Sequence, residues 1–509
     1  MPSRVHSAAV VGVDAFEVEI EVHASMWGQD ARVTVVGLPD AAVRESRDRT
    51  LSDIHNSGLR EPPGRITISL APADLRKEGP SFDLPIALGL LALNDKSRLP
   101  DLDAFCFTGE LALSGRLRPV KGALAIALEA RRRGWRALVL PAHNADEAAV
   151  VDGLEIVGAA TLAEVVLFLR GERELPRGIA RVARPAPSAE VDFAEVKGQP
   201  HVKRAIEVAA AGEHNLLMIG PPGSGKSMIA KRIPSILPPL TLAEAIETTK
   251  IHSVCGLLEG KDPFVWDRPF RTPHHTISDA GLLGGTAHPS PGEVSLAHHG
   301  VLLLDELPEF RRSTLEVMRQ PLEDGKVTIS RAAGTMTFPA EFMLVAAMNP
   351  CPCGHYGDVK RECRCHPGQV LKYRSRLSGP LLDRVDLHVE VPAMELQDLT
   401  DATEGESSER IRERVTLARL RQQKRFAAEP QVTSNARMGS RLLRRHCALE
   451  PEGTELLRRA VSALNLSARA HDRILKVART IADLAGADRI QAVHLAEAVQ
   501  YRSLDRQLW

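Results

Sequence analysis

The segment 215–233, NLLMIGPPGSGKSMIAKRI, constrains the fold more than any other part of the chain. It carries the pattern G-x-x-x-x-G-K-[ST] between an apolar run typical of a buried strand and a sequence that begins a helix. Glycines let backbone N–H groups surround a phosphate at a helix N-terminus. Lys226 would reach the β- and γ-phosphates of ATP and Ser227 would hold Mg²⁺, whereas the alternative is a plain turn before a helix. The predicted nucleotide-binding residues are Gly220, Pro221, Pro222, Gly223, Ser224, Gly225, Lys226 and Ser227.

Two later apolar runs end in polar residues that would complete such a site. GVLLLDELPEF (300–310) predicts a buried strand that ends in Asp305 and Glu306. We expect Asp305 to hold the metal and Glu306 to polarise the attacking water, although a solvated acidic turn would also fit. LVAAMNP (344–350) predicts another strand, whose terminal Asn349 could orient the water or simply begin an Asn–Pro turn.

The residues after this strand suggest a subunit contact followed by a helical region. SGPLLDRVDLHVEV (378–391) places Arg384 before a further strand, at an expected subunit edge. An arginine supplied to a neighbouring active site stabilises transition-state charge, and a structural salt bridge is the alternative. Periodic runs at 408–426, 451–463, 470–484 and 492–502 predict a helical bundle.

Length and charge restrict the possible classes of protein. A chain of 509 residues predicts about three domains. Basic and acidic residues number 65 each, which excludes a globally basic nucleic-acid coat protein but not a local basic surface. Residues 401–509 indeed hold 20 basic and 14 acidic residues. Aromatic residues are 4% of the chain, which disfavours binding mainly by base stacking. With no signal peptide or membrane span in the sequence, we expect a cytoplasmic protein.

Four of the seven cysteines lie in CPCGHYGDVKRECRC, residues 351–365. Two close pairs of thiolates could hold Zn²⁺, although C-x-C spacing is tighter than the usual C-x₂₋₄-C and would strain adjacent ligands. The candidate zinc ligands are Cys351, Cys353, Cys363 and Cys365, with His355 and His366 as spare ligands. Reduced thiols in a surface loop are the alternative. Residues 359–384 carry seven Lys or Arg against two Asp or Glu, so this stretch could track phosphates or be a solvated loop.

The order of these motifs resembles that of AAA+ ATPases. RPFRTPHHTISDAGLLGGTAHPSPGEVSLAHHGVLLLDELPEF, AAMNPCPCG, SGPLLDRVDLH and VVGLPDAAVRESRDR are similar to the magnesium-chelatase-like AAA+ family of the ComM/YifB type. The resemblance covers essentially the whole chain. It implies an α/β multidomain protein with a Lon-protease-like α+β domain at 1–175, a linker at 176–192, an AAA+ core with a parallel sheet at 193–395 and a helical domain at 396–509.

The resemblance also implies a function. It predicts a homo-hexameric ring that hydrolyses ATP between subunits and drives branch migration on DNA during homologous recombination, notably in natural transformation. In this family Asn349 would be sensor 1, Arg384 the arginine finger and Arg469 the sensor 2 residue. Arg473, four residues further along the same helix face, is the nearest competitor for that last role.

The Lon resemblance raises the question of a Ser–Lys peptidase dyad. RKEGPSFD (76–83) is similar to the segment that bears the Lon nucleophile, and Ser81 falls on that position. In TGELALSGRLRPVKGALAIAL (108–128) the lysine position falls on Ile126, which cannot act as a base, and Lys121 lies five residues early. We therefore expect a non-peptidase domain that works in subunit contact or ring assembly; otherwise Ser81 is a simple turn residue.

Candidate DNA contacts lie in LEDGKVTISRAAGTMTFPAEF (322–342), which predicts a β-hairpin. In this AAA+ branch a hairpin at that place often faces the ring pore, so Lys326 and Arg331 are the candidate residues. The His-His pairs at 274–275 and 298–299 could bind a metal, but adjacent side chains on a strand point to opposite faces, which favours polar contacts facing the ring instead. The alternative function is an ATP-dependent remodeller of a protein partner, of chelatase or chaperone type, since a P-loop reports only nucleotide chemistry.

Overall fold

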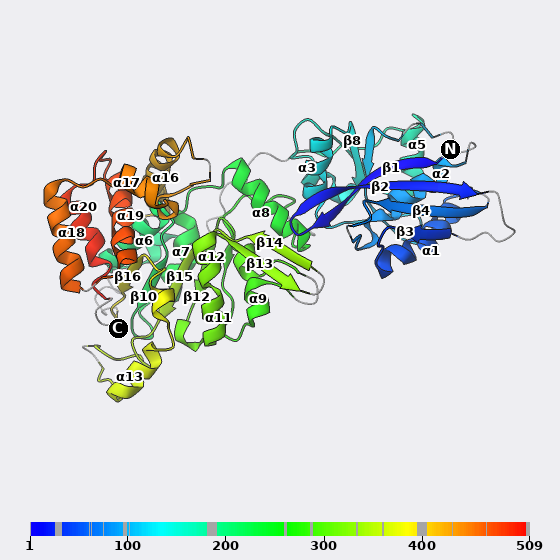
Figure 1. Cartoon of the computed structure of the whole chain (residues 1–509). Helices are drawn as coiled ribbons and strands as arrows, with labels where there is room; N and C mark the ends of the chain where they lie inside the picture. The colour runs from blue at the N-terminus through cyan, green and yellow to red at the C-terminus, as the bar shows by residue number, and fades with distance from the viewer. Residues whose placement is uncertain are drawn as a thin grey trace. The chain divides into compact units, whose positions relative to one another are not determined.

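The computed structural model describes residues 2–504 apart from 26–32, 61, 63, 75, 95–98, 101, 181–190, 259–261, 286–288, 332–333, 359–360, 394–404, 430 and 465. The chain divides into two compact units (Figure 1). Unit 1 comprises Met1–Pro185 and Ala245–Val265, and unit 2 comprises Ala186–Glu244 and Trp266–Trp509. Within the described ranges, no helix is long and apolar enough to cross a membrane.

Unit 2 is built on a parallel sheet with the strand order β11-β12-β15-β10-β16. All side chains of β10, β12 and β15 are buried, as expected for strands covered on both faces. Because β10 lies between β15 and β16, the strand order reverses there, and such reversals are where open α/β sheets bind ligands. The strands are β10 (Leu216–Ile219), β11 (Phe270–Arg271), β12 (Val301–Leu304), β15 (Met343–Met348) and β16 (Leu387–Glu390).

The other elements of this sheet domain lie between and before the strands. The helices are α6 (Pro200–Gly212), α7 (Lys226–Ile236), α9 (Asp279–Leu283), α10 (Glu293–Leu296), α11 (Arg312–Val317), α12 (Arg319–Asp324), α13 (Pro367–Arg374) and α14 (Gly379–Leu382). Short 3₁₀ turns are η4 (Phe193–Glu195) and η5 (Leu307–Glu309). Strands β13 (Lys326–Arg331) and β14 (Gly334–Pro339) pair as a separate antiparallel hairpin, as the sequence predicts.

The last part of the chain is helical and packs on the sheet domain. Its elements are α16 (Ser408–Arg425), η6 (Asn435–Arg437), α17 (Ser440–His446), α18 (Pro451–Leu464), α19 (Ala468–Leu484) and α20 (Ala492–Gln500), drawn in orange to red in Figure 1. Helices α16 and α19 contact α6, and one hydrophobic cluster runs from Phe193 to Tyr501. Helix α19 begins where the Ser467 hydroxyl accepts a hydrogen bond from the Ala470 N–H at 3.2 Å, an N-cap.

Unit 1 contains a mixed sheet with the order β3-β4-β2-β1-β5-β8-β9 and its own buried cluster. The strands are β1 (Ser3–Val11), β2 (Asp14–Ser25), β3 (Val33–Val36), β4 (Arg65–Ala71), β5 (Phe105–Phe107), β8 (Ala137–Pro141) and β9 (Glu155–Ala159), beside a small pair β6 (Glu110–Leu111) and β7 (Leu117–Arg118). The helices are α1 (Ala41–Asn56), α2 (Asp83–Ala92), α3 (Ala123–Arg133), α4 (Ala145–Ala148) and α5 (Leu162–Leu169), with η1 (Pro80–Phe82) and η3 (Ala142–Asn144).

Most of helix α8 (Leu242–Val254) belongs to unit 1, a packing that the sequence did not predict. The buried Ser253 hydroxyl donates to the Glu147 carboxylate and accepts from the Gly122 N–H at 3.0 Å. Burial raises the pKa of Glu147, and the hydrogen bond from Ser253 opposes that rise. The boundaries expected at residues 175 and 192 remain predictions, and the one at 395 lies outside the described residues.

Candidate functional site

Three predicted site segments meet at one edge of the parallel sheet of unit 2. Strand β15 lies between β10 and β12, with Met348 opposite Ile219 and Ala346 opposite Leu304. The carboxyl ends of all three strands therefore point to the same edge. The glycine-rich loop, Asp305 and Asn349 follow these strands directly, so the sheet register alone brings them together.

The glycines of the loop have different physical roles. Gly223 and Gly225 have φ values of 77° and 90°, in the left-handed region that favours glycine. Gly225 is also the residue from which α7 begins. At Gly220 an added Cβ would lie 2.1 Å from the Val391 carbonyl oxygen, so this glycine is required by close backbone packing. The loop thus presents backbone N–H groups at the N-terminus of an 11-residue helix, an arrangement that suits a phosphate.

Lys226 lies at the centre of this edge and is buried. Its ammonium group donates to the carbonyl oxygens of Gly220 and Pro221 at 2.7 and 2.8 Å, and to the Asn349 side-chain oxygen at 3.2 Å. Burial lowers the pKa of Lys226, and the Asp305 charge opposes this. The direct hydrogen-bond partners of Lys226 are neutral oxygens, not a carboxylate. Its positive charge is therefore not neutralised by direct contact and is suited to binding phosphate oxygens.

Ser227 and Asp305, the predicted Mg²⁺ ligands, are in direct contact. The Ser227 hydroxyl donates to Asp305 Oδ2, and Asp305 Oδ1 accepts from the Glu306 N–H at 2.9 Å. A hydroxyl and a carboxylate side by side are oxygen donors of the kind that Mg²⁺ prefers. The donor set therefore fits the cation that accompanies ATP.

Glu306 has a partner that sequence reasoning missed. His275 Nδ1 lies 3.4 Å from Glu306 Oε2, and Glu306 has a φ of 53°, which a non-glycine residue rarely adopts. The His275 ring also lies against His274, with centroids 4.1 Å apart. Neither this pair nor 298–299 belongs to a strand, so the expected opposite orientation was wrong for both. The repeated His-His pairs were the only hint in the sequence that these histidines have a role. Their positions in the sequence could not indicate that His275 contacts Glu306.

Arg384 lies at the opposite edge of the same sheet. Its carbonyl oxygen accepts from the side chain of Asn215, the residue that precedes β10, whereas the glycine-rich loop follows β10. The intervening strand is about 13 Å long at 3.3 Å per residue. The Arg384 guanidinium pairs with Glu323 and is 8% exposed. The Arg384 backbone therefore lies at the end of β10 opposite the nucleotide edge, and its guanidinium is held there by Glu323.

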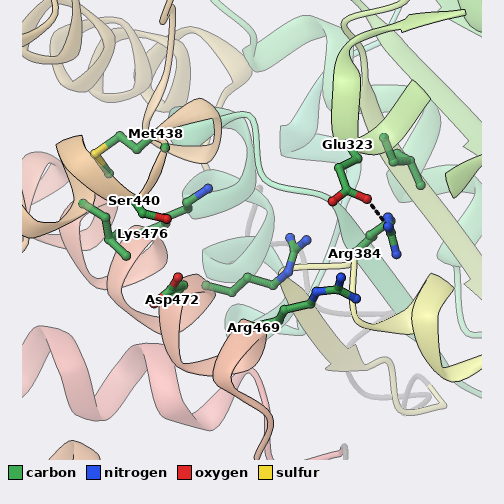
Figure 2. A pocket seen from close by; sticks show the side chains of 11 residues that line it. Glu323, Arg384, Met438, Ser440, Arg469, Asp472 and Lys476 are labelled. Carbon is green, nitrogen blue, oxygen red and sulfur yellow. Dashed lines mark hydrogen bonds and ion pairs between the residues drawn. The ribbon is translucent and has the colours of Figure 1, made fainter. Parts of the chain in front are cut away.

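Arg384 and Arg469 line one pocket of about 210 Å³ (Figure 2). Figure 2 shows Arg469, from α19, extending toward the Glu323–Arg384 pair. The pKa of Glu323 is lowered, chiefly by the hydrogen bond from Arg384 and further by the positive charges of Arg384 and Arg469. The competitor Arg473 also lines the pocket but pairs with the buried Asp386, a contact that the sequence did not predict. Arg469 is exposed and makes no ion pair within the described residues.

The four predicted zinc ligands form a compact cluster. Their thiols lie within 4.8 Å of one another, and three of the sulfur–sulfur distances are 3.4, 3.6 and 3.7 Å. Four sulfurs at 2.3 Å from a zinc ion would be about 3.8 Å apart, so the cluster can hold a metal ion. Of the expected spare ligands, His355 pairs with Asp358 at 3.0 Å, and His366 is exposed and donates its backbone N–H to Gln369 at 3.0 Å at the start of α13.

The two candidate DNA contacts of the β13–β14 hairpin are exposed but lie on different faces. Arg331 shares the face of Ile329, where it donates to the Gly285 carbonyl oxygen at 3.5 Å, and it also donates to the Ser330 carbonyl oxygen at 3.1 Å. Lys326 lies on the solvent-exposed face. On the same face, two cross-strand pairs of hydroxyls are each 3.0 Å apart, Thr328 with Thr337 and Ser330 with Thr335. The opposite face, with Val327 and Ile329, is buried. The exposed face thus presents Lys326 together with these hydroxyls, which suits contacts to phosphates.

The geometry of unit 1 provides no dyad at the Lon-like positions. Ser81 lies in η1, where its carbonyl oxygen accepts from the Gly109 N–H at 2.9 Å. Ile126 is buried in α3, and Lys121 is exposed just before that helix. Among the described residues no hydrogen bond links Ser81 to a lysine, and the buried Lys77 instead donates to the Pro72 carbonyl oxygen.

Comparison with known proteins identifies the family. Residues 192–399 match the family "Magnesium chelatase, subunit ChlI", residues 20–144 match "Subunit ChlI of Mg-chelatase", and residues 405–502 match the ChlI C-terminal family. The chain is 46% identical to YifB of Salmonella typhimurium over 99% of its length and 97% of that protein. It is also 46% identical to the competence protein ComM of Haemophilus influenzae, over 99% of this chain and 98% of that protein. The chain belongs to the magnesium-chelatase-like family of the ComM/YifB type.

Membership of the ComM/YifB family supports ATPase activity with ATP and Mg²⁺, in agreement with the mixed α/β architecture and its parallel sheet. The Lon relationship is weaker. A match of 124 residues, 29% identical, links 23% of the chain to 15% of a Lon protease from Protochlamydia amoebophila.

Proposed function

We propose that this chain is the subunit of an ATP-hydrolysing ring that moves on DNA, acting as a helicase for branch migration in homologous recombination. One observation carries the ATPase part: Lys226, Asp305 and Asn349 converge at the carboxyl edge of one parallel sheet. The relative named for competence supports the connection with DNA uptake and natural transformation.

Each residue of this edge receives a role from its contacts. Lys226 and the loop N–H groups bind the phosphates, and Ser227 with Asp305 holds Mg²⁺, which neutralises phosphate charge when bound. Glu306 polarises the attacking water, and Asn349, already within hydrogen-bond distance of Lys226, orients it near the γ-phosphate. The loop alone fits any P-loop enzyme; the addition of Glu306 and Asn349 favours hydrolysis.

The opposite edge of the sheet supports a ring. Arg384 and Arg469 line one pocket that includes no residue of the nucleotide loop of the same chain. In the proposed homo-hexamer they serve the nucleotide of the neighbouring subunit, where arginine stabilises the transition-state charge. The Glu323–Arg384 ion pair opens when the neighbour's phosphates arrive.

DNA is contacted by the β13–β14 hairpin. Lys326, with the hydroxyls on its face, and the exposed Arg331 next to the turn bind the phosphate backbone, which requires no sequence preference. A neutral total charge of 65 basic and 65 acidic residues agrees with a ring that touches DNA at selected surfaces only.

Three further assignments complete the proposal. The metal ion of the four-cysteine cluster is Zn²⁺ in a structural role, because four thiolates without an open position favour a closed zinc site. Unit 1 has no peptidase activity, since the Lon lysine position is occupied by the buried Ile126. The protein works in the cytoplasm, where reduced cysteines persist; all seven are free thiols.

The decisive experiment is ATP hydrolysis by the full chain with single-stranded, duplex, forked and four-way DNA, with strand displacement and branch migration measured in parallel. We expect DNA to stimulate hydrolysis with a steep salt dependence. Lys226→Ala should abolish nucleotide binding, whereas Glu306→Gln should bind ATP without turnover. An ATPase that no DNA structure stimulates, and that displaces no strand, would refute the motor and favour the remodeller of a protein partner.

Mixed rings test the action between subunits. Arg384→Ala rings should not hydrolyse ATP. Mixing them with subunits that lack Lys226 should restore turnover, because one interface then combines an intact loop with an intact arginine. Absence of rescue would mean that Arg384 acts within its own subunit or only supports the structure.

A further inference from the structure

The cysteine loop begins where the nucleotide site ends. Cys351 follows Asn349 and Pro350 directly at the end of β15, and Cys351 is fully buried. The second cysteine pair ends at Cys365, two residues before α13 begins at Pro367. A metal ion held by all four thiols would therefore close this loop at its base and fix α13 relative to Asn349.

The loop touches the phosphate-binding loop through a glycine. Gly354 has a φ of 85°, and a Cβ added there would lie 2.4 and 2.6 Å from two ring carbons of Pro222. Real Cβ atoms do not approach other atoms so closely. The backbone of the cysteine loop is thus in contact with the nucleotide loop, and only a glycine fits between them.

The helix that follows the cysteines returns to the other strand ends. Arg374, the last residue of α13, donates to the Pro350 carbonyl oxygen at 3.2 Å, directly after Asn349. Arg376 donates to the Pro308 carbonyl oxygen at 3.0 Å, two residues after Glu306. Together with Gly354, these contacts reach all three segments of the nucleotide edge.

We propose that the four-cysteine loop is a metal-dependent brace of the nucleotide site, so that metal occupancy regulates how tightly the subunit binds ATP. With the metal bound, Gly354 supports the phosphate-binding loop, and Arg374 supports the segment that carries Asn349. The inference rests on the proposed ATP and metal sites but not on the choice of DNA as the substrate.

Two glycine substitutions in the same loop distinguish loss of the contact with Pro222 from backbone strain within the cysteine loop. Gly354→Ala adds a Cβ that collides with Pro222, whereas Gly357→Ala, with a φ of 80°, has nothing within 4 Å of its added Cβ. Both substitutions impose the same left-handed penalty on alanine, and both leave the four thiols in place. The measurements on the full-length protein are zinc content by elemental mass spectrometry and binding of fluorescent N-methylanthraniloyl-ATP in the absence of DNA.

We expect both variants to retain zinc and Gly354→Ala to bind the analogue about tenfold more weakly than Gly357→Ala, because a shift of about 1 Å in a positioned group has effects of at least this size. Removing zinc from the wild type should weaken binding similarly, and adding Zn²⁺ should restore it. Equal affinities of the two variants, unchanged affinity of the zinc-free protein, or a wild type that takes up no zinc would each overturn the proposal. A wild type with zinc but without any affinity for the analogue would instead refute the proposed ATPase.

Discussion

The contact between Arg473 and Asp386 yields a quantitative prediction that separates the two candidate sensor arginines of α19. Asp386 is 3% exposed, and its carboxylate accepts a hydrogen bond from the backbone N–H of Asn215 at 2.9 Å. Burial alone would raise the pKa of Asp386, but Arg473 and His214 hold it well below its usual range. Arg473→Ala therefore leaves a buried carboxylate without its main counter-charge.

The cost follows from the geometry of this ion pair. Removing one partner of a buried pair costs about 3–5 kcal/mol in free energy of unfolding. The nearby Lys476 also acts on Asp386 and remains in the variant, so we expect the lower end, about 3 kcal/mol. For a large domain this corresponds to a fall in Tm of roughly 6–12 °C.

Thermal unfolding of Arg473→Ala and Arg469→Ala, both in the full chain, provides the assay. Arg469 is the matched control because it lies one turn earlier on α19 and lines the same pocket, yet is exposed. We expect Arg469→Ala to keep the wild-type Tm while losing ATP hydrolysis. The reasoning is refuted if the two variants have equal Tm values, or if adding Asp386→Asn to Arg473→Ala restores no stability.

The same carboxylate predicts a dependence on pH. Its pKa in the folded state lies below the ordinary value of 3.8, so the folded state binds fewer protons at this site than the unfolded chain. The stabilisation is fully present above about pH 4 and is lost as the pH falls below this value. The Tm difference between wild type and Asp386→Asn should accordingly shrink on acidification, and a difference that grows would contradict the assignment.

Two other contacts give simpler predictions. His275→Ala should lower the turnover of ATP without weakening its binding, because His275 contacts Glu306 rather than the phosphate loop; the adjacent His274→Ala should change turnover less, and equal losses in both would argue against a positioning role. Ser253→Ala should destabilise unit 1 by about 1–3 kcal/mol, because it leaves the buried Glu147 carboxylate with one hydrogen bond fewer. Unchanged protease resistance of unit 1 would count against that estimate.

The strand ends of the nucleotide edge were predictable from sequence for a physical reason. A parallel strand covered on both faces must be apolar throughout, so a polar residue or glycine at its end marks the edge sharply. β10 and β12 coincide with apolar runs in the two predicted segments, and Gly220 and Asp305 follow them directly. The β13–β14 hairpin was also predictable, because its two strands are close together in the sequence.

Long-range partners could not be predicted in this way. Two arginines four residues apart share a helix face, and only the position of Asp386, 87 residues earlier, shows that Arg473 is already paired. Likewise the sequence around Ser253 does not predict its hydrogen bond to Glu147, 106 residues away. Contacts of this kind depend on tertiary packing rather than on local propensity.

In the proposed ring, the two edges of the unit 2 sheet belong to two different active sites. Its carboxyl edge carries a lysine held only by neutral oxygens, and its amino edge carries an arginine whose charge is held by a carboxylate, Glu323. Neither cation can reach the other's position within one subunit, because a buried strand lies between them. In the proposed ring each interface joins one edge of each kind, so ATP binding and subunit contact stabilise each other. Hydrolysis then changes nucleotide binding and the subunit contact at the same time, and a motor requires this coupling.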